Sequence, residues 1–238
     1  MASTTDYVEL RCRSAFSFLA GASLPEDLVE RAAALGLDSL ALADRSGLYA
    51  APRFFLAARK AGVRPLVGAE VMIEGAGLVW LLVESRAGYR RLCRLLTDAA
   101  LGRAKGAAAA RWEQLEEHAG GLFCLAGGAE GPLARPEAAA HLDRLCGIFG
   151  ERVAVDVHRH GERAGERLAR SLIDLAATRG VPVVATNDVR HAMPGGRALL
   201  DVLTCIRLGT TLDAAGRRLL RNTERHLKTP AEMAALRE

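Results

Sequence analysis

The feature that most constrains this sequence is a regular alternation of short apolar runs with longer amphipathic stretches. Apolar runs such as Ser39–Ala43 and Val153–Val157 are typical of strands buried on both faces. Stretches such as Tyr49–Ala61 and Glu162–Arg179 carry apolar residues at helical spacing, and a glycine follows each. Because the alternation repeats about seven times, the sequence predicts an α/β fold.

Four local features are expected from the same patterns. Tyr7–Cys12 alternates like a first strand, and Ser23 is suited to be the N-cap of the first helix, in a capping box with Glu26. The small residues at about 102–111 predict a flexible surface linker. Gly196–Arg207 is predicted to form a helix near the C-terminus. Its expected buried side consists of Leu199, Leu200, Val202, Leu203 and Ile206.

Two phosphate-binding motifs are missing, which narrows the fold further. No GxGxxG follows the first expected strand, and no GxxxxGK[ST] occurs in the chain. Rossmann and P-loop folds are therefore disfavoured, and an irregular (β/α) barrel fits better. Such barrels place their chemistry at the C-terminal ends of the strands. The polar residues expected at those ends are Arg11, Arg13, Asp44, Arg45, Glu70, His160, Asp188 and Arg190.

Arg11 and Arg13 are unusual at the end of a buried strand. Residues two apart on a strand point to the same face, so these two positive charges lie close together. They repel each other unless anionic groups lie between them. The pair therefore predicts nearby carboxylates or a bound anion.

The length of 238 residues fits one large domain or two small ones. Half of the residues are hydrophobic, enough for a sizeable core, and no apolar run reaches the roughly 18 residues of a membrane span. Met1–Asp6 lacks the apolar core of a signal peptide, so we expect a cytoplasmic protein without a membrane partner. The five cysteines form no CxxC pair, which indicates reduced thiols rather than a zinc ribbon.

The net charge of +4 is concentrated near the C-terminus. Residues 189–238 hold nine Lys and Arg against five Asp and Glu, which accounts for the whole excess. Such a basic segment can face nucleic acid or an acidic partner. The alternative is an ordinary solvated surface in an arginine-rich protein.

Five segments in order resemble one known family, the PHP (polymerase and histidinol phosphatase) domain. These are LRCRSAFSFLAGAS, LALADRSGLYAAPRF, PLVGAEV, VDVHRHG and VVATNDVRHA. More narrowly, SAFSFLAGAS followed by PEDLVERAAALGLDSLALAD is similar to the N-terminal PHP domain of bacterial C-family DNA polymerases of the error-prone branch. The resemblance covers residues 7–236 and implies that residues 1–238 form a single domain, a distorted (β/α)7 TIM-like barrel. Active members of the family bind a cluster of metal ions and cleave phosphoesters.

The resemblance also implies which positions are metal ligands in active members, and this chain keeps few of them. Retained are Glu70, His160 and Asp188, and Asp44 stands where the family has the Asp of an Asp-His pair. The other ligand positions are occupied by Arg11, Arg13, Ala20, Arg45, Gly128 and Arg190. His158 and His191 match no ligand position and are expected at the surface.

These replacements predict that the domain binds no metal cofactor. Imidazoles and carboxylates bind metals through lone pairs, whereas a guanidinium has none available and stays cationic. One hypothesis is an arginine–carboxylate network in which the four arginines meet Asp44, Glu70 and Asp188. The other is an anion site, in which the arginines hold a phosphate or a nucleic-acid backbone.

The function implied by the resemblance is that of a structural platform in an error-prone, translesion-type DNA polymerase associated with DNA repair and replication. This chain alone is expected to be inactive, and the parent enzyme would be a nucleotidyltransferase with Mg²⁺ in its polymerase domain. Implied partners are the rest of the polymerase chain, DNA, a sliding clamp and accessory mutagenesis proteins. The alternatives are a metal-dependent phosphoesterase or 3'-5' exonuclease, and a stand-alone module that binds nucleic acid or phosphate.

Overall fold

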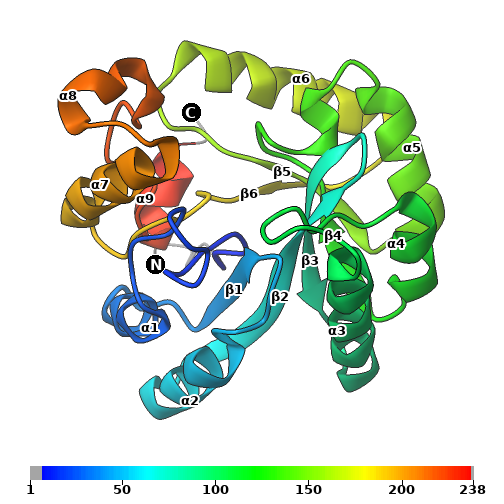
Figure 1. Ribbon diagram of the computed structural model, residues 1–238, viewed down its shortest axis with the longest axis horizontal. Coiled ribbons are helices and arrows are strands. Elements are labelled where there is room, and N and C mark those ends of the chain that lie inside the picture. Colours follow the sequence, from blue (N-terminus) through cyan, green and yellow to red (C-terminus); the bar gives the residue numbers. More distant parts are fainter. Residues whose placement is uncertain (1–6, 237–238) are drawn as a thin grey trace, which may run out of the picture. The chain divides into compact units, whose positions relative to one another are not determined.

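The structure, a computed structural model, describes residues 7–236 and divides into two compact units. Unit 1 comprises Met1–Arg45, Tyr49–Leu66 and Asn187–Glu238, and unit 2 comprises Ser46–Leu48 and Val67–Thr186. The strands follow one another in the sheet in the order β1-β2-β3-β4-β5-β6 (Figure 1). Strand β2 (Arg64–Ile73) begins in unit 1 and continues into unit 2.

The remaining elements fall cleanly into one unit or the other. Unit 1 contains α1 (Pro25–Ala34), β1 (Ser39–Arg45), α2 (Ala51–Ala61), η2 (Pro194–Gly196), α7 (Arg197–Leu208), α8 (Leu212–Ala215), η3 (Gly216–Arg218) and α9 (Pro230–Ala235). Unit 2 contains β3 (Gly77–Val83), α3 (Arg86–Ala100), α4 (Trp112–His118), β4 (Leu122–Leu125), η1 (Pro132–Ala134), α5 (Ala138–Phe149), β5 (Val153–Val157), α6 (Arg163–Arg179) and β6 (Val183–Ala185). Most of these elements begin and end within a few residues of the stretches that apolar periodicity predicts.

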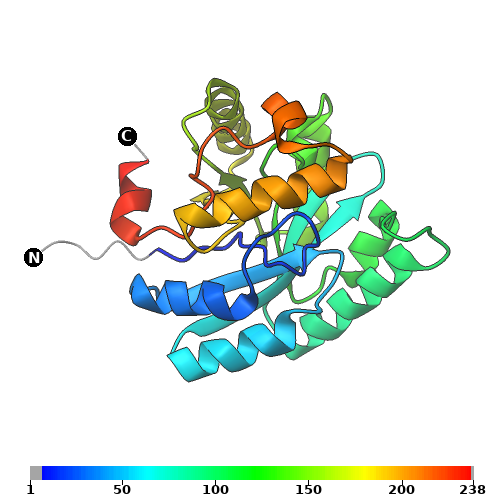
Figure 2. The same cartoon turned by 60° about the vertical axis from the view of Figure 1, so that its left-hand side comes forward.

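In unit 1, α1 and α2 lie side by side (Figures 1 and 2). Each turns its apolar stripe inward, so Leu28 and Phe54 are fully buried, and α1 also packs on β1. Helix α2 ends at Gly62, whose φ of 73° is a left-handed conformation that glycine adopts without steric cost.

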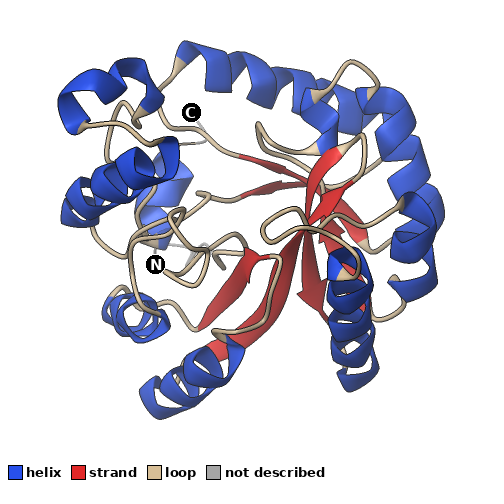
Figure 3. Cartoon of the chain, viewed as in Figure 1, coloured by secondary structure: helices blue, strands red, loops and turns tan. Residues whose placement is uncertain are grey.

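Unit 2 contains a mixed sheet, which helices α3, α5 and α6 flank (Figure 3). Strand β3 pairs antiparallel with β2 and β4, while β5 pairs parallel with β4 and β6. The first six residues of β3 are all buried, as expected for a strand covered on both faces. Leu92 of α3, Leu145 of α5 and Leu172 of α6 join Leu81 in one apolar core.

The expected first strand forms only in part, and this corrects the prediction over Tyr7–Cys12. The segment makes isolated parallel bridges at Glu9 and Cys12 but no continuous strand among the described residues. The backbone N–H of Arg11 donates to the Glu9 carboxylate at 2.8 Å. A donor used by a side chain is lost to a sheet ladder, which explains the interruption.

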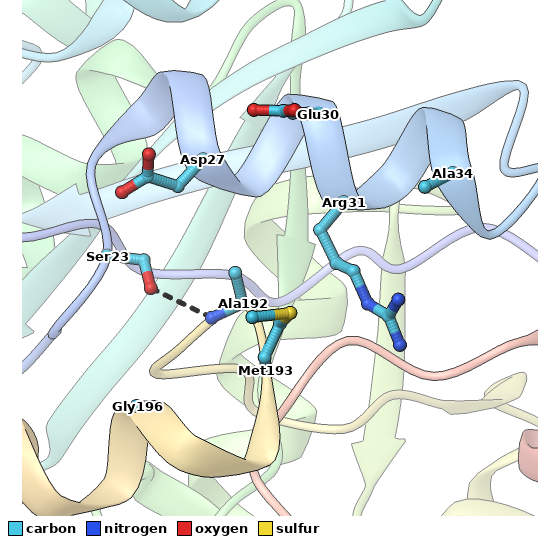
Figure 4. Close-up of a pocket in the computed structure, with 8 residues that line it drawn as sticks. All are labelled: Ser23, Asp27, Glu30, Arg31, Ala34, Ala192, Met193 and Gly196. Carbon is cyan, nitrogen blue, oxygen red and sulfur yellow. Dashed lines mark hydrogen bonds between the residues drawn. The ribbon is translucent and has the colours of Figure 1, made fainter.

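Ser23 does not have the role that the sequence predicts for it. The N-cap of α1 is Leu24, and the Asp27 carboxylate accepts a hydrogen bond from the Leu24 N–H at 3.1 Å. The Ser23 hydroxyl instead accepts from the backbone N–H of Ala192 at 2.9 Å (Figure 4). This bond ties the start of α1 to a segment far away in the sequence.

The segment expected to be a flexible linker contains no helix or strand from residue 102 to residue 109, and most of it is exposed. Near its end Ala110 is buried, forms a parallel bridge with Ile73 and donates its N–H to the carbonyl of Met72 at 2.8 Å. The last residues of the predicted linker are therefore anchored to β2.

Candidate functional site

The candidate site in unit 1 is centred on Asp188. The N-terminal segment runs beside it in extended conformation, because Val189 N–H donates to the Arg11 carbonyl at 2.8 Å and Arg13 N–H donates to the Val189 carbonyl at 2.9 Å. Asp188 itself has a φ of 45°, in the left-handed region that few residues other than glycine adopt. This backbone places two arginines of one segment next to one carboxylate.

Four guanidinium groups contact the Asp188 carboxylate. Arg11 Nε lies 3.4 Å and Arg13 Nη1 lies 2.9 Å from Oδ1. Arg190 Nη2 lies 3.2 Å from Oδ2, and Arg225 Nη1 also pairs with Oδ2. Arg11, Arg13 and Asp188 are buried. The carboxylate thus lies between the like charges of Arg11 and Arg13, where the sequence predicts an anionic group.

The charge balance around Asp188 keeps it ionised. Burial alone raises the pKa of the Asp188 carboxyl, but the guanidiniums of Arg13, Arg190, Arg225 and Arg11 outweigh it and hold the pKa well below its usual value. An ionised carboxylate whose oxygens accept from arginines has its lone pairs occupied. It is therefore poorly suited to bind a divalent metal.

Asp44, the second carboxylate of the expected site, is held by serines. Its Oδ1 accepts from Ser14 N–H at 2.8 Å and from the Ser17 hydroxyl at 2.6 Å, and its Oδ2 accepts from the Ser14 hydroxyl at 2.7 Å. Burial raises the pKa of Asp44, against the lowering effect of these bonds. Arg45 N–H donates to Ser17 Oγ at 3.0 Å, so the loop after the N-terminal segment is fixed to the end of β1.

Glu9 is a third buried carboxylate, which sequence reasoning missed. Its Oε2 accepts from the Tyr7 hydroxyl at 2.6 Å and from Asn187 N–H at 2.9 Å, while Oε1 accepts from Arg11 N–H. Burial, which these bonds only partly offset, raises the pKa of Glu9 to about 7. An acidic residue inside an alternating apolar run is the signal that would have found it.

Arg225 is the other residue that the sequence did not single out. It follows Glu224 in an irregular segment, and Asn187 Nδ2 holds that segment by donating to the carbonyls of Glu224 and His226 at 2.7 Å each. No periodic pattern marks Arg225, because it reaches Asp188 through a tertiary contact 37 residues away.

In unit 2, Glu70 lies fully buried in β2, opposite Trp80 of β3. His160 is buried, and its ring stacks on that of His158 at 6.0 Å between centroids. His158 Nε2 lies 2.9 Å from the Asp156 carboxylate. The meeting of Glu70 with the arginines of unit 1 stays a prediction.

Glycines 127 and 128 follow β4, and the resemblance marks position 128 as a further ligand position. Gly127 N–H donates to the Asp156 carboxylate at 2.6 Å, and a Cβ at Gly127 would lie 1.7 Å from the Asp156 carbonyl oxygen. Gly128 has a φ of 83°, which disfavours any other residue. Local backbone geometry therefore explains the two glycines.

The expectation that His158 and His191 lie at the surface is wrong. The Asp156 carboxylate holds the half-buried His158, and His191 is fully buried. His191 Nδ1 lies 2.8 Å from the Met193 carbonyl oxygen, and its ring stacks on that of His226. Burial lowers the pKa of His191, so the neutral imidazole is favoured.

A pocket of about 410 Å³ lies between α1 and the segment before α7, apart from Asp188 and its four arginines. Figure 4 shows Asp27 and Glu30 on α1 on one side of it and Met193 on the other. Its lining residues are Ser23, residues of α1 and residues from 192 to 196, and they include none of the predicted ligand positions. The pocket therefore does not coincide with the predicted ligand positions.

Residues 7–236 contain neither a metal-binding cluster nor a membrane-spanning helix. No group of three or more His, Cys, Asp or Glu in that range is placed to hold a metal ion. Within the same described range, no helix combines the length and the apolar character needed to span a membrane.

Comparison with known proteins identifies related sequences along almost the whole chain. The family model described as PHP domain matches residues 9–160. The chain is 48% identical over 247 residues to a protein of Anaeromyxobacter sp. (strain K) and 36% identical over 230 residues to one of Agrobacterium fabrum. These are named error-prone DNA polymerase and error-prone DNA polymerase 1, and each match covers 97% of this chain. The chain spans about a fifth of the length of these relatives, 21% in both cases.

Solved structures show the same fold at low sequence identity. An amidohydrolase from Chromobacterium violaceum, with bound sulfate and no metal, matches with a TM-score of 0.54 at 16% identity, covering 77% of this chain and 87% of its own. A two-domain protein from Bacteroides vulgatus that contains a predicted PHP-like metal-dependent phosphoesterase matches with a TM-score of 0.52 at 13% identity, covering 95% and 61%. With the family match, these likenesses confirm the predicted fold class, a distorted α/β barrel.

Proposed function

Since the chain belongs to the PHP domain family, we propose that it is the PHP domain of an error-prone DNA polymerase and that its own metal centre is degenerate. The part of the polymerase outside these 238 residues would carry nucleotidyl transfer, with Mg²⁺ there and none in this domain. The proposal extends to a cytoplasmic, translesion enzyme of DNA repair that binds DNA, a sliding clamp and accessory mutagenesis proteins.

The proposal of a degenerate metal centre is supported by the ion pairs between Asp188 and four arginines. Asp188 is one of three retained ligand positions, and here its oxygens accept from guanidiniums. Asp44, at another ligand position, has its oxygens occupied by Ser14 and Ser17. The residues present therefore do not fit a metal cluster, and the arginines supply positive charge at the same place.

A structural role follows from the same contacts. The ion pairs join the N-terminal segment, the segment around Asp188 and the C-terminal segment at Arg225. Breaking a buried pair of this kind costs several kcal/mol, because the remaining charge stays buried. The former metal centre would thus stabilise the domain that supports the polymerase.

Metal analysis and a hydrolysis assay test the proposal. We expect the purified protein, after incubation with Zn²⁺ or Mn²⁺ and desalting, to retain far less than one ion per chain by elemental mass spectrometry. We also expect no hydrolysis of a phosphomonoester or of single-stranded DNA by this domain, because no metal is present to generate hydroxide near neutral pH.

The competing functions give different results in the same experiment. A phosphoesterase or exonuclease would bind two or more ions and lose turnover in Glu70→Gln, but not in Glu116→Gln, which changes an exposed residue of α4. A stand-alone nucleic-acid module would bind single-stranded DNA without metal and with strong salt dependence. Either result would replace the proposed function.

A further inference from the structure

Helix α7 carries apolar residues on both of its faces. Its inner face is buried through Leu200, Thr204 and Cys205. On the opposite face Leu199, Val202 and Ile206 are 51%, 42% and 61% exposed, although the sequence predicts them in the core. We call these three residues the α7 stripe. An exposed apolar face of this kind is typical of a helix that packs on a second surface.

Two more large apolar side chains are exposed near the C-terminal end of α7. Leu208 at the last turn and Leu212 of α8 are also large exposed apolar residues, and α8 packs on α7. In Figure 2, α7 (orange) faces the viewer along its length, and α8 follows at its C-terminal end. Scattered exposed leucines are ordinary, but a row of exposed apolar side chains along one face of a helix indicates an interaction surface.

Arginines follow the α7 stripe in the chain. Residues 207–221 contain four arginines and one aspartate, and Arg207, Arg217 and Arg218 are exposed. An apolar centre with a charged rim is the usual composition of a protein–protein interface, and arginine is enriched there. The matching surface on a partner would be apolar with an acidic border.

We propose that the α7 stripe is the surface on which the remainder of the same polymerase polypeptide packs. The chain accounts for 21% of the length of its error-prone polymerase relatives, so about four-fifths of such a polypeptide lies outside it. That remainder is present at high effective concentration because it is covalently attached. This inference rests on the proposed function and adds the location of the contact.

Two other occupants fit the surface less well. A second copy of this domain would bring a second basic border against the first, and like charges across an interface are unfavourable. A DNA backbone would meet the arginines, but the apolar side chains between them offer no partner to phosphate.

Photo-crosslinking in the full-length polypeptide tests the proposal. A benzophenone amino acid replaces Val202 in one variant and Ile206 in a second, so that a folding defect in one does not decide the result. The matched control replaces Leu101, which is 68% exposed just after α3 in unit 2. After irradiation, cross-linked peptides are located by mass spectrometry, and the ratio of intramolecular to intermolecular products is measured.

We expect positions 202 and 206 to cross-link within one polypeptide to residues outside these 238, at least fivefold more often than position 101. Cross-links mainly between two copies, equal yields at positions 101 and 202, or no cross-link to the remainder would overturn the proposal. The outcome is independent of metal content and hydrolysis. The polymerase assignment can therefore stand while this location fails.

Discussion

Asp188 and Glu9 are two buried carboxylates of the same unit, and their environments shift their pKa values in opposite directions. Four guanidiniums hold the pKa of Asp188 well below its usual value, despite the opposing effect of burial. Among the described residues, Glu9 accepts from a phenol and two backbone N–H groups and from no cation, and burial raises its pKa to about 7. Burial is similar at the two sites, so the difference shows that charged partners decide which acid stays ionised.

The largest effect on stability is expected from Asp188→Asn, which removes the negative charge that the four arginines contact. The neutral amide leaves Arg11, Arg13, Arg190 and Arg225 without the carboxylate that they share. We expect the free energy of unfolding to fall by about 3–5 kcal/mol. Urea denaturation at pH 7 measures it, with Asp174→Asn on the exposed side of α6 as the control. Equal stability of the two variants would contradict the assigned ion pairs.

The raised pKa of Glu9 predicts that the stability of the protein depends on pH. The folded pKa of about 7 lies above the unfolded value of 4.5, so the folded protein keeps a proton that the unfolded chain releases. The stability contributed by protonated Glu9 is thus complete below pH 4.5 and is lost as the pH rises to about 7, by about 3 kcal/mol.

Glu9→Gln cannot titrate, so we expect this particular loss to disappear, whatever the absolute stability of the variant. The measurement is the slope of unfolding free energy against pH between 4.5 and 7, with the exposed Glu30→Gln as the control. A slope that Glu9→Gln leaves unchanged would assign the pH dependence to other groups.

Histidine substitutions compare the contributions of individual arginines to stability. Arg13 is 1% exposed, whereas the side chain of Arg190 is 19% exposed. We therefore expect Arg13→His to cost about 2 kcal/mol and Arg190→His about 1 kcal/mol. Thermal melts rank the two variants.

Histidine at positions 11 and 13 together is not expected to restore metal binding, because Ala20, Arg45, Gly128 and Arg190 remain non-ligands. Zinc retention by the Arg11→His/Arg13→His protein, measured as above, would show instead that those positions are dispensable. Melts unchanged from the parent would mean that the guanidiniums contribute little in solution.

Apolar periodicity predicted most helices and strands because local pattern determines them, and β5 has the predicted bounds. The prediction failed where one side chain competes with the backbone. Glu9 takes the Arg11 N–H and interrupts the expected first strand, and Ser23 bonds Ala192 rather than its own helix. Composition could not reveal either bond, because each depends on a specific tertiary or side-chain contact.

The residues of the site could be predicted where the family resemblance implies a ligand position, and not elsewhere. Arg11, Arg13 and Asp188 stand at ligand positions, and the structure brings them together. Arg225 comes from an irregular segment without periodicity, so no pattern indicated it. The α7 stripe was predicted in the core for a related reason, since periodicity shows that a face is apolar but does not say what covers it.

The many-to-one pairing at Asp188 also has a consequence for mutational tolerance. When one arginine is replaced, the carboxylate keeps three partners, so the loss is shared and each single change is buffered. A second or third replacement leaves Asp188 with fewer arginines. The losses of stability are then non-additive, because these side chains contact one shared carboxylate. The aspartate has no such redundancy. Sequence drift at this centre is therefore asymmetric: the arginines can vary singly, whereas the aspartate is fixed for as long as they remain.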